Sequence, residues 1–225
     1  MTAIEVVRHP RARRMKLSID NATGQVRLTL PPRVALAEVL RLIEANRRWI
    51  AGKVASLPLP RPIRPGGYLP FNGNEMMLDW QPDLPRRPEL DVAGKRLSVG
   101  GPFEGLAARV ERWMRGEALR LLTEETDHYA RKAGCPVEAV RVGDPKGRWG
   151  SCSSRSRIAY SWRLVMAPEW VRRAVVAHEV AHLVHLNHSP AFHRLHRQLL
   201  GCEPAPAKAW LAVHGPALYW VGRDR

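Results

Sequence analysis

The sequence predicts an α+β fold, with strands concentrated towards the N terminus and helices towards the C terminus. Residues 15–30 and 68–99 alternate apolar and polar side chains with the period of two that is typical of half-buried strands. Residues 103–133 and 171–188 instead repeat apolar side chains at helical spacing. Strands followed by helices, rather than a strict alternation of the two, favour the α+β class.

We predict two regions: a β-rich N-terminal region with one helix at 1–100, and a region at 101–225 that holds the functional site. The two could also form one compact unit, because 225 residues can bury one sizeable core or a core and a small domain. A stretch rich in Pro and Gly at 58–70 is either a linker or a long loop.

The first predicted element is a β-hairpin. Apolar residues alternate with polar ones on both sides of residues 21–24, whose sequence Asn-Ala-Thr-Gly is typical of a turn. We interpret the arginines that precede the hairpin either as a phosphate-binding edge or as charges that protect an edge strand from aggregation. These arginines are Arg8, Arg11, Arg13 and Arg14.

Three further elements follow the hairpin. Residues 33–57 have the apolar spacing of a helix, in which Trp49 is expected to pack in the core. A second small β unit is predicted at 68–99. A long helix is predicted at 103–133, and Gly134 ends it.

The next predicted segment, 137–166, contains a strand, a turn and a second strand. The second strand is expected to include the alternating apolar residues from Ile158 to Leu164. Pro168 stands at a plausible first position of the following helix. A strand at the sheet edge would then lie beside that helix, where an extended peptide could pair with it.

A metal-binding pattern, H-E-x-x-H, lies in the apolar stretch 171–188. His178 and His182 are four residues apart, so their imidazoles share one helix face and can reach one ion. Glu179 points about 100° away around the helix axis, from where it can reach a water on that ion. This arrangement is typical of zinc hydrolases in which the Glu acts as general base.

The third ligand must come from one of three nearby histidines: His185, His188 and His193. On a continuing helix, His185 lies about 10.5 Å along the axis from His178, which is beyond comfortable reach of the ion. Asn187 and Pro190 predict that the helix stops, and a turn there can bring His188 back towards the ion. We therefore predict a Zn²⁺ site formed by His178, His182 and His188, with water in the fourth position.

The amino-acid composition narrows the kinds of binding partner and the cellular compartment that we expect for this protein. The formal net charge of +15 suggests contact with a polyanion, although dispersed arginines are equally consistent with a solvated surface. Three widely spaced cysteines argue against a disulfide framework. No signal peptide and no stretch of membrane-spanning length is found, so we expect a cytoplasmic protein without membrane contact.

The chain resembles the YgjP-like family of zinc-dependent metallopeptidases, which is related to the SprT-like proteins of the zincin group. The resemblance covers nearly the whole chain. It rests on RRMKL at 13–17, Trp49-Ile50, RWGSCS at 148–153, Trp162-Arg163-Leu164 and HEVAHLVHLNHSPAF at 178–192. It implies a compact zincin-like fold of the minimal gluzincin type with a β-rich N-terminal region. It also implies that the three histidines named above are zinc ligands and that Glu179 is the catalytic base.

Two positions depart from the family pattern. Ser161 stands where members often have Asn. His193, which follows Phe192, stands where members often have Trp. Neither change removes a ligand. Some members are associated with nucleoside triphosphate pyrophosphohydrolase activity, which the basic charge makes plausible here.

Three hypotheses follow for the function. The leading one is a metallopeptidase, in which Glu179 takes a proton from water and passes it to the leaving amine. The second is a metal-dependent nucleoside triphosphate pyrophosphohydrolase that acts on UTP, with Arg148 holding phosphates. The third is a nucleic-acid-associated protein with a metal site. In the metallopeptidase hypothesis, the group that donates a hydrogen bond to the oxyanion could be His185, Tyr160 or the loop 148–153, and the sequence does not choose among them.

Overall fold

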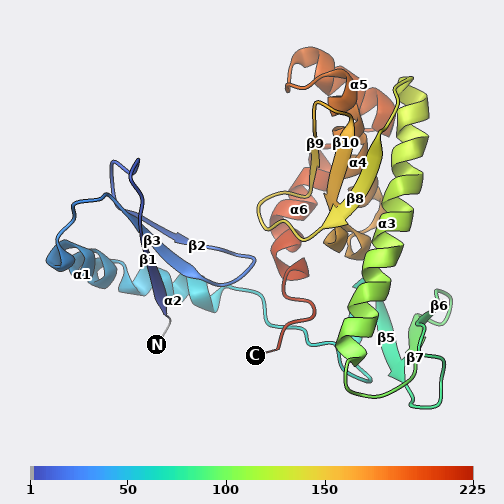
Figure 1. The fold of residues 1–225 in the computed structure, drawn as a ribbon, viewed down its shortest axis with the longest axis horizontal. Helices are drawn as coiled ribbons and strands as arrows, with labels where there is room; N and C mark the ends of the chain where they lie inside the picture. The colour runs from blue at the N-terminus through green and yellow to red at the C-terminus, as the bar shows by residue number, and fades with distance from the viewer. Residues whose placement is uncertain (1–2, 225) are drawn as a thin grey trace. The chain divides into compact units, whose positions relative to one another are not determined.

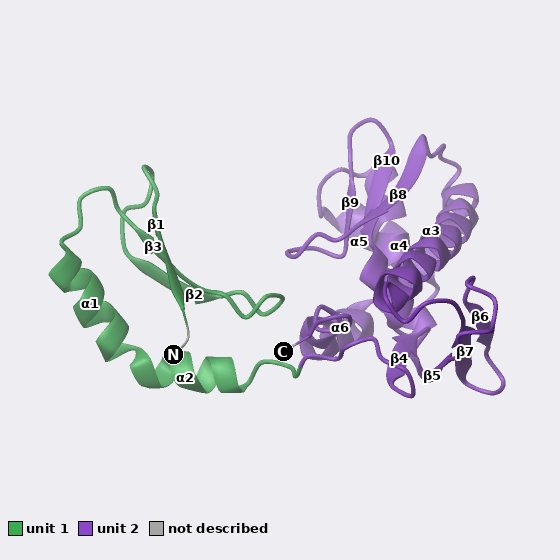
Figure 2. Ribbon diagram, turned by 60° about the horizontal axis from the view of Figure 1, so that its bottom comes forward, with its two compact units in different colours: residues 1–59 green, residues 60–225 purple. Residues whose placement is uncertain are grey.

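The computed structural model describes residues 3–224 and confirms the predicted α+β class. Contacts divide the chain into two compact units, one up to Leu59 and one from Pro60 onwards (Figure 2). We refer to them as unit 1 and unit 2 and describe each by itself. The division predicted from the sequence, into 1–100 and 101–225, separates a β-rich region from the region that holds the functional site. It does not describe contacts between residues, and it stays a prediction.

Unit 1 is a three-stranded sheet with two helices. Strand β1 (Ile4–Arg8) pairs in parallel with β3 (Val26–Leu30), and β2 (Lys16–Ile19) pairs antiparallel with the other edge of β3. The antiparallel pair confirms the predicted hairpin. Helices α1 (Leu36–Ala45) and α2 (Arg47–Ala55) follow.

The single helix predicted at 33–57 is wrong, because the helix breaks at Asn46. The side-chain amide of Asn46 donates to the Leu42 carbonyl at 2.8 Å, a local bond that competes with regular helix propagation. Ile50 is buried, whereas Trp49 is 43% exposed, so the prediction that Trp49 packs in the core is also wrong.

Unit 2 begins with the predicted second β unit. Its strands are β4 (Tyr68–Phe71), β5 (Asn74–Trp80), β6 (Glu89–Asp91) and β7 (Arg96–Val99), in the order β4-β5-β7-β6. The apolar residues of β5 and β7 enter the large core of unit 2. The prediction for 68–99 is therefore confirmed.

Helix α3 (Leu106–Ala133) is the long helix predicted from the sequence, and it runs beside the next sheet and the following helix (Figure 1). It ends where Gly134 adopts a left-handed conformation with φ of 67°, which glycine does without steric cost. Strands β8 (Ala139–Gly143), β9 (Gly150–Cys152) and β10 (Arg157–Ser161) form a sheet in the order β8-β10-β9.

The last predicted strand ends earlier than expected. Residues Trp162–Met166 form a short 3-10 helix, η1, in which the Ser161 hydroxyl accepts a bond from the Arg163 N–H. All five residues of η1 are buried, so the apolar alternation did not distinguish a half-buried strand from a fully buried turn of helix.

Three helices complete unit 2: α4 (Glu169–Val184), α5 (Pro190–Leu200) and α6 (Ala205–Leu218). Helix α4 contacts α3, α5, α6 and the edge strand β9, and most of its apolar residues lie in or against the core. Among the described residues, no helix combines the length and the apolar character needed to cross a bilayer.

Candidate metal centre

The three histidines predicted as ligands lie together. His178 and His182 project from α4, and His188 comes from the loop between α4 and α5. One ring nitrogen of each lies within 4.8 Å of those of the other two, and Nε2 of His188 is 3.3 Å from Nε2 of His178. The other two candidates, His185 and His193, do not belong to this group among the described residues.

The loop that carries His188 is fixed at both ends. Helix α4 ends at Val184, earlier than the stop expected at Asn187, and His185 has an extended backbone. Ser189 then caps α5, because its Oγ accepts a bond from the Phe192 N–H. The chain therefore turns between two helix ends, and this turn places His188 over α4.

The backbone at the end of α4 selects the tautomer of His182. Its Nδ1 lies 2.9 Å from the carbonyl oxygen of His185. A carbonyl only accepts hydrogen bonds, so Nδ1 carries the proton and Nε2 keeps its lone pair. A bond of this kind is what orients a metal-binding imidazole in many proteins.

The environment of the two histidines on α4 favours their neutral form. Burial, followed by the charge of the nearby His196, lowers the pKa of His178 to about 3. Burial also lowers the pKa of His182. Neutral imidazole is the form that binds a metal ion. The buried ring of Phe192 packs against all three histidine rings, at centroid distances of 4.9, 4.4 and 4.8 Å.

Glu179 lies on α4 against the edge strand β9 and is only 5% exposed. A Cβ added to Gly150 of that strand would lie 2.5 Å from Oε1 of Glu179, so the carboxylate occupies the space that the glycine leaves. Burial raises the pKa of Glu179 to about 7, and the charge of Arg148 acts in the opposite direction. The glycine of the RWGSCS segment thus has a specific role beside this carboxylate.

The rest of the RWGSCS segment fixes the position of β9. Trp149 packs against the ring of Tyr219 at a centroid distance of 5.3 Å. It also lies so close to α6 that a Cβ added to Gly215 would be 2.7 Å from its ring. Cys152 is partly buried, and burial raises the pKa of its thiol to about 11, which favours the neutral thiol over a thiolate.

Tyr160, one of the candidate oxyanion donors, points elsewhere. It is fully buried on β10, and its hydroxyl lies 3.0 Å from Oγ1 of Thr126 on α3. Its side chain therefore contacts the α3 layer. His185 and the loop 148–153 remain as candidate donors.

A cavity of about 860 Å³ lies beside the three histidines. His178, His188 and Glu179 form part of one wall. The opposite wall belongs to α6 and the turn before it, and it is mainly apolar. Its residues include Pro204, Ala205, Ala207, Leu211 and Ala212, with Glu203 and Lys208 as the charged members.

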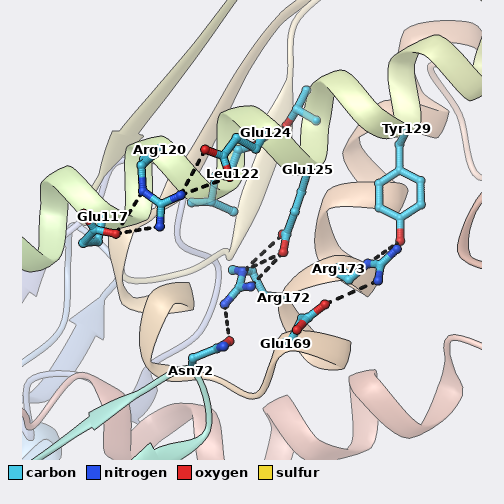
Figure 3. Close-up of polar contacts among 11 residues, drawn as sticks. Asn72, Glu117, Arg120, Leu122, Glu124, Glu125, Tyr129, Glu169, Arg172 and Arg173 are labelled. Carbon is cyan, nitrogen blue, oxygen red and sulfur yellow. Dashed lines mark hydrogen bonds and ion pairs between the residues drawn. The ribbon is translucent and has the colours of Figure 1, made fainter. Parts of the chain in front are cut away.

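Helix α4 is anchored by a buried arginine that the sequence did not reveal. Arg172 donates to Glu125 of α3 at 2.7 Å and to Oδ1 of Asn72 at 2.7 Å (Figure 3). Its side chain is 2% exposed, and that of Glu125 is 14% exposed. These contacts hold the helix that carries His178 against two neighbouring elements.

A second buried arginine, from the Trp-Arg-Leu segment, connects η1 with the C-terminal segment. Arg163 forms a two-pronged ion pair with Asp144, at 2.7 and 3.1 Å. It also donates to the carbonyl of Leu218 at 2.6 Å, at the end of α6. This arginine therefore helps to position the helix that forms the far wall of the cavity.

Sequence reasoning also missed His196. It is buried on α5, its Nε2 lies 3.1 Å from the Ala174 carbonyl of α4, and its ring centroid is 5.2 Å from that of His178. The signal was present, because His196 follows Phe192 by four residues and therefore shares its helix face.

Comparisons with known proteins are consistent with this geometry. A family model described as YgjP-like, metallopeptidase domain, matches residues 13–214. That range includes all the histidines described above and the RWGSCS segment. Such a family implies a divalent metal ion. Searches of curated proteins and of solved structures gave no significant match.

Proposed function

Because the chain belongs to the YgjP-like metallopeptidase-domain family, we propose that it is a zinc-dependent peptidase that hydrolyses peptide bonds with Glu179 as general base. One observation carries the proposal: the buried carboxylate of Glu179 lines the same cavity as His178 and His188, whose ring nitrogens cluster with one of His182. This is the set of groups that hydrolysis with a metal-activated water requires.

The donor set fits zinc. The ion would be held by imidazole nitrogens of His178, His182 and His188. Zn²⁺ prefers such nitrogen ligands to an all-oxygen coordination shell. Three protein ligands leave a position for water or substrate, which is the catalytic rather than the structural type of site. Partial burial and the hydrogen bond from His182 Nδ1 to the His185 carbonyl prepare the lone pairs for this role.

Zinc bound here would polarise the scissile carbonyl and lower the pKa of the attacking water. The part of the protein is proton transfer. Glu179 takes a proton from the attacking water and gives it to the leaving amine. A pKa of about 7 suits both steps, because the carboxylate must first accept a proton and then release it.

The surroundings fit an extended peptide. Strand β9 is an edge of its sheet and lies against α4, so its free edge can pair with a substrate backbone. The cavity beside it offers an apolar wall for a substrate side chain. We propose that the main chain pairs with β9 while a side chain enters this cavity.

The test compares two conservative substitutions in the zinc-loaded protein. Glu179→Gln removes the base, whereas Glu169→Gln changes an exposed carboxylate on the same helix that does not line the cavity. Digestion of a denatured protein, followed by mass spectrometry of the products, should slow by about 10²–10⁴-fold in Glu179→Gln and stay near wild type in Glu169→Gln. Equal activity in Glu179→Gln and wild type, with equal zinc content, would refute the role of Glu179.

A second candidate function is hydrolysis of a nucleoside triphosphate such as UTP. Arg148 favours it, because this exposed guanidinium acts electrostatically on Glu179 and can bind phosphate oxygens bidentately. The purified zinc protein should then release pyrophosphate from UTP, and both Glu179→Gln and Arg148→Gln should abolish the release. Protein digestion without UTP turnover would leave the peptidase as the function.

A further inference from the structure

Positive charge is concentrated in unit 1. Eleven of the 36 Lys and Arg residues but only four of the 21 Asp and Glu residues lie in residues 1–59. Unit 1 thus has a formal charge of +7, against +8 for the much longer remainder of the 225-residue chain. The basic composition, which looks dispersed along the sequence, therefore belongs disproportionately to one small compact unit.

Most of these cations gather at one end of the sheet. Arg8, the last residue of β1, pairs with Leu30, the last residue of β3. Lys16, the first residue of β2, pairs with Thr29. The loop 9–15 therefore crosses this end of the sheet, and the turn after β3 begins at the same place.

Arg8 holds the two loops together. Its guanidinium donates to the carbonyl of Pro32 at 2.9 Å and to that of Val34 at 3.2 Å. The N–H of His9 donates to the Leu30 carbonyl at 2.9 Å. The loop that carries the arginines is thus attached to the segment before α1.

We define the basic end of unit 1 as six exposed residues: Arg8, Arg11, Arg13, Arg14, Lys16 and Arg33. Within the described part of the chain, none of the six forms an ion pair with a carboxylate. Between residues 6 and 37 the sequence contains one acidic residue, Asp20. It lies in the turn at the opposite end of the sheet, and its carboxylate accepts a bond from the Ala22 N–H.

We propose that the basic end of unit 1 binds the phosphodiester backbone of nucleic acid. Five of its six cations are arginines, whose planar fork matches the geometry of phosphate oxygens. Several unpaired cations on one compact surface are the usual electrostatic footprint of such binding. The N terminus of α1 at Leu36 adds partial positive charge after the same turn.

Neither protection of a sheet edge nor binding to a membrane surface accounts for this charge as well. Charges that protect an edge strand from aggregation belong on the strand, but Arg11, Arg13 and Arg14 lie in a loop. Stable binding to a membrane surface usually combines such charge with the apolar face of an amphipathic helix. Helix α1 does expose Leu36 and Leu40, but it contains two Glu residues and a single Arg.

Nucleic-acid binding at this end does not depend on the proposed peptidase activity, because it uses residues of unit 1 alone. The test uses the full chain and a triple substitution, Arg11→Gln, Arg13→Gln and Arg14→Gln. The matched control replaces three exposed arginines of unit 2 that form no ion pair among the described residues. These are Arg87, Arg112 and Arg131, each changed to Gln.

Fluorescence anisotropy with a labelled DNA duplex and with a labelled RNA strand, over a series of salt concentrations, gives the readout. The wild type should bind at least one of them with an affinity that falls steeply with salt, and the two arms identify which. The unit 1 triple variant should bind about tenfold or more weakly, with a salt slope lower by about 2–3. The unit 2 control should bind like the wild type.

Two results would overturn the proposal. One is the absence of salt-dependent binding to both DNA and RNA. The other is an equal loss of affinity in the two triple variants, which would indicate an effect of net charge alone. Circular dichroism checks that both variants fold, and digestion of a protein substrate should be unchanged in both.

Discussion

Oε1 of Glu179 lies 2.5 Å from the point where any other residue at position 150 would place its Cβ, so the helix carboxylate and the strand glycine occupy complementary space. This contact joins α4 to the edge strand β9. It gives a physical reason for a glycine in the middle of the RWGSCS segment.

Replacing this glycine should move the carboxylate. In Gly150→Ala, the methyl group would contact Glu179 at a distance that forces one of them to shift. We expect digestion of a protein substrate to slow by about tenfold to a hundredfold, because proton transfer depends on the position of the base. Zinc content should stay unchanged, because the histidines are not displaced.

Gly147→Ala is the matched control. It immediately precedes the RWGSCS segment, and a Cβ added there meets no atom within 4 Å. Its activity should equal that of the wild type. If the two alanine variants are equally active, the close approach of Gly150 and Glu179 has no role in catalysis.

The loop histidines should differ in their effect on zinc. His188→Ala removes one of the three clustered nitrogens, so bound zinc measured by mass spectrometry of dialysed protein should fall by about tenfold or more. His185→Ala should retain zinc, because His185 contributes only its backbone carbonyl, which accepts the bond from His182. The opposite ranking would reassign the third ligand to His185.

The buried pair between Arg172 and Glu125 should contribute strongly to stability. Arg172→Met leaves a carboxylate that is already costly to bury, since burial raises the pKa of Glu125. We expect a loss of about 3–5 kcal/mol in the free energy of unfolding, measured by urea denaturation. By contrast, Arg157→Met removes an exposed pair with Glu138 and should cost less than about 1 kcal/mol.

A double variant separates two causes of that loss. If the cost in Arg172→Met comes from an unpaired carboxylate, then adding Glu125→Leu should recover most of the lost stability. A double variant as unstable as Arg172→Met would instead assign the loss to packing around Asn72 and α3.

The cysteines should react with iodoacetamide in an order set by exposure and by thiolate formation. Cys202 is exposed and should be alkylated first. A pKa raised to about 11 leaves Cys152 almost entirely as the unreactive thiol at pH 8, and its reaction should accelerate as the pH rises towards that value. Rapid alkylation of Cys152 at pH 7, located by peptide mapping, would contradict this environment.

Local sequence patterns predicted which helices and strands lie near the site, but they predicted the first and last residues of these elements less accurately. The grouping of His178, His182 and His188 follows from helical spacing and a stop signal, both of which act over a few residues. The helix nevertheless ends at Val184, because Asn187 marks the turn without fixing its first residue. The catalytic role of Glu179 and the identity of the metal stay predictions.

Other features depend on details that periodicity does not carry. A side-chain bond of Asn46 accompanies the break between α1 and α2, and the short helix η1 is a completely buried apolar run. The apolar wall that α6 adds to the cavity depends on Arg163, whose partner Asp144 lies 19 positions away. An apolar repeat contains no information about such pairings.

Because α4 ends early, the affinity of the three histidines for a metal ion depends on the order of the loop that follows the helix. If the helix continued, the His185 carbonyl would be directed along the helix axis to a later N–H group and would be lost to His182. A substitution in 185–189 that lengthens the helix would therefore weaken zinc binding without touching a ligand. By the same linkage, a metal ion held by the three histidines would stabilise this loop by as much free energy as an ordered loop adds to the binding of that ion.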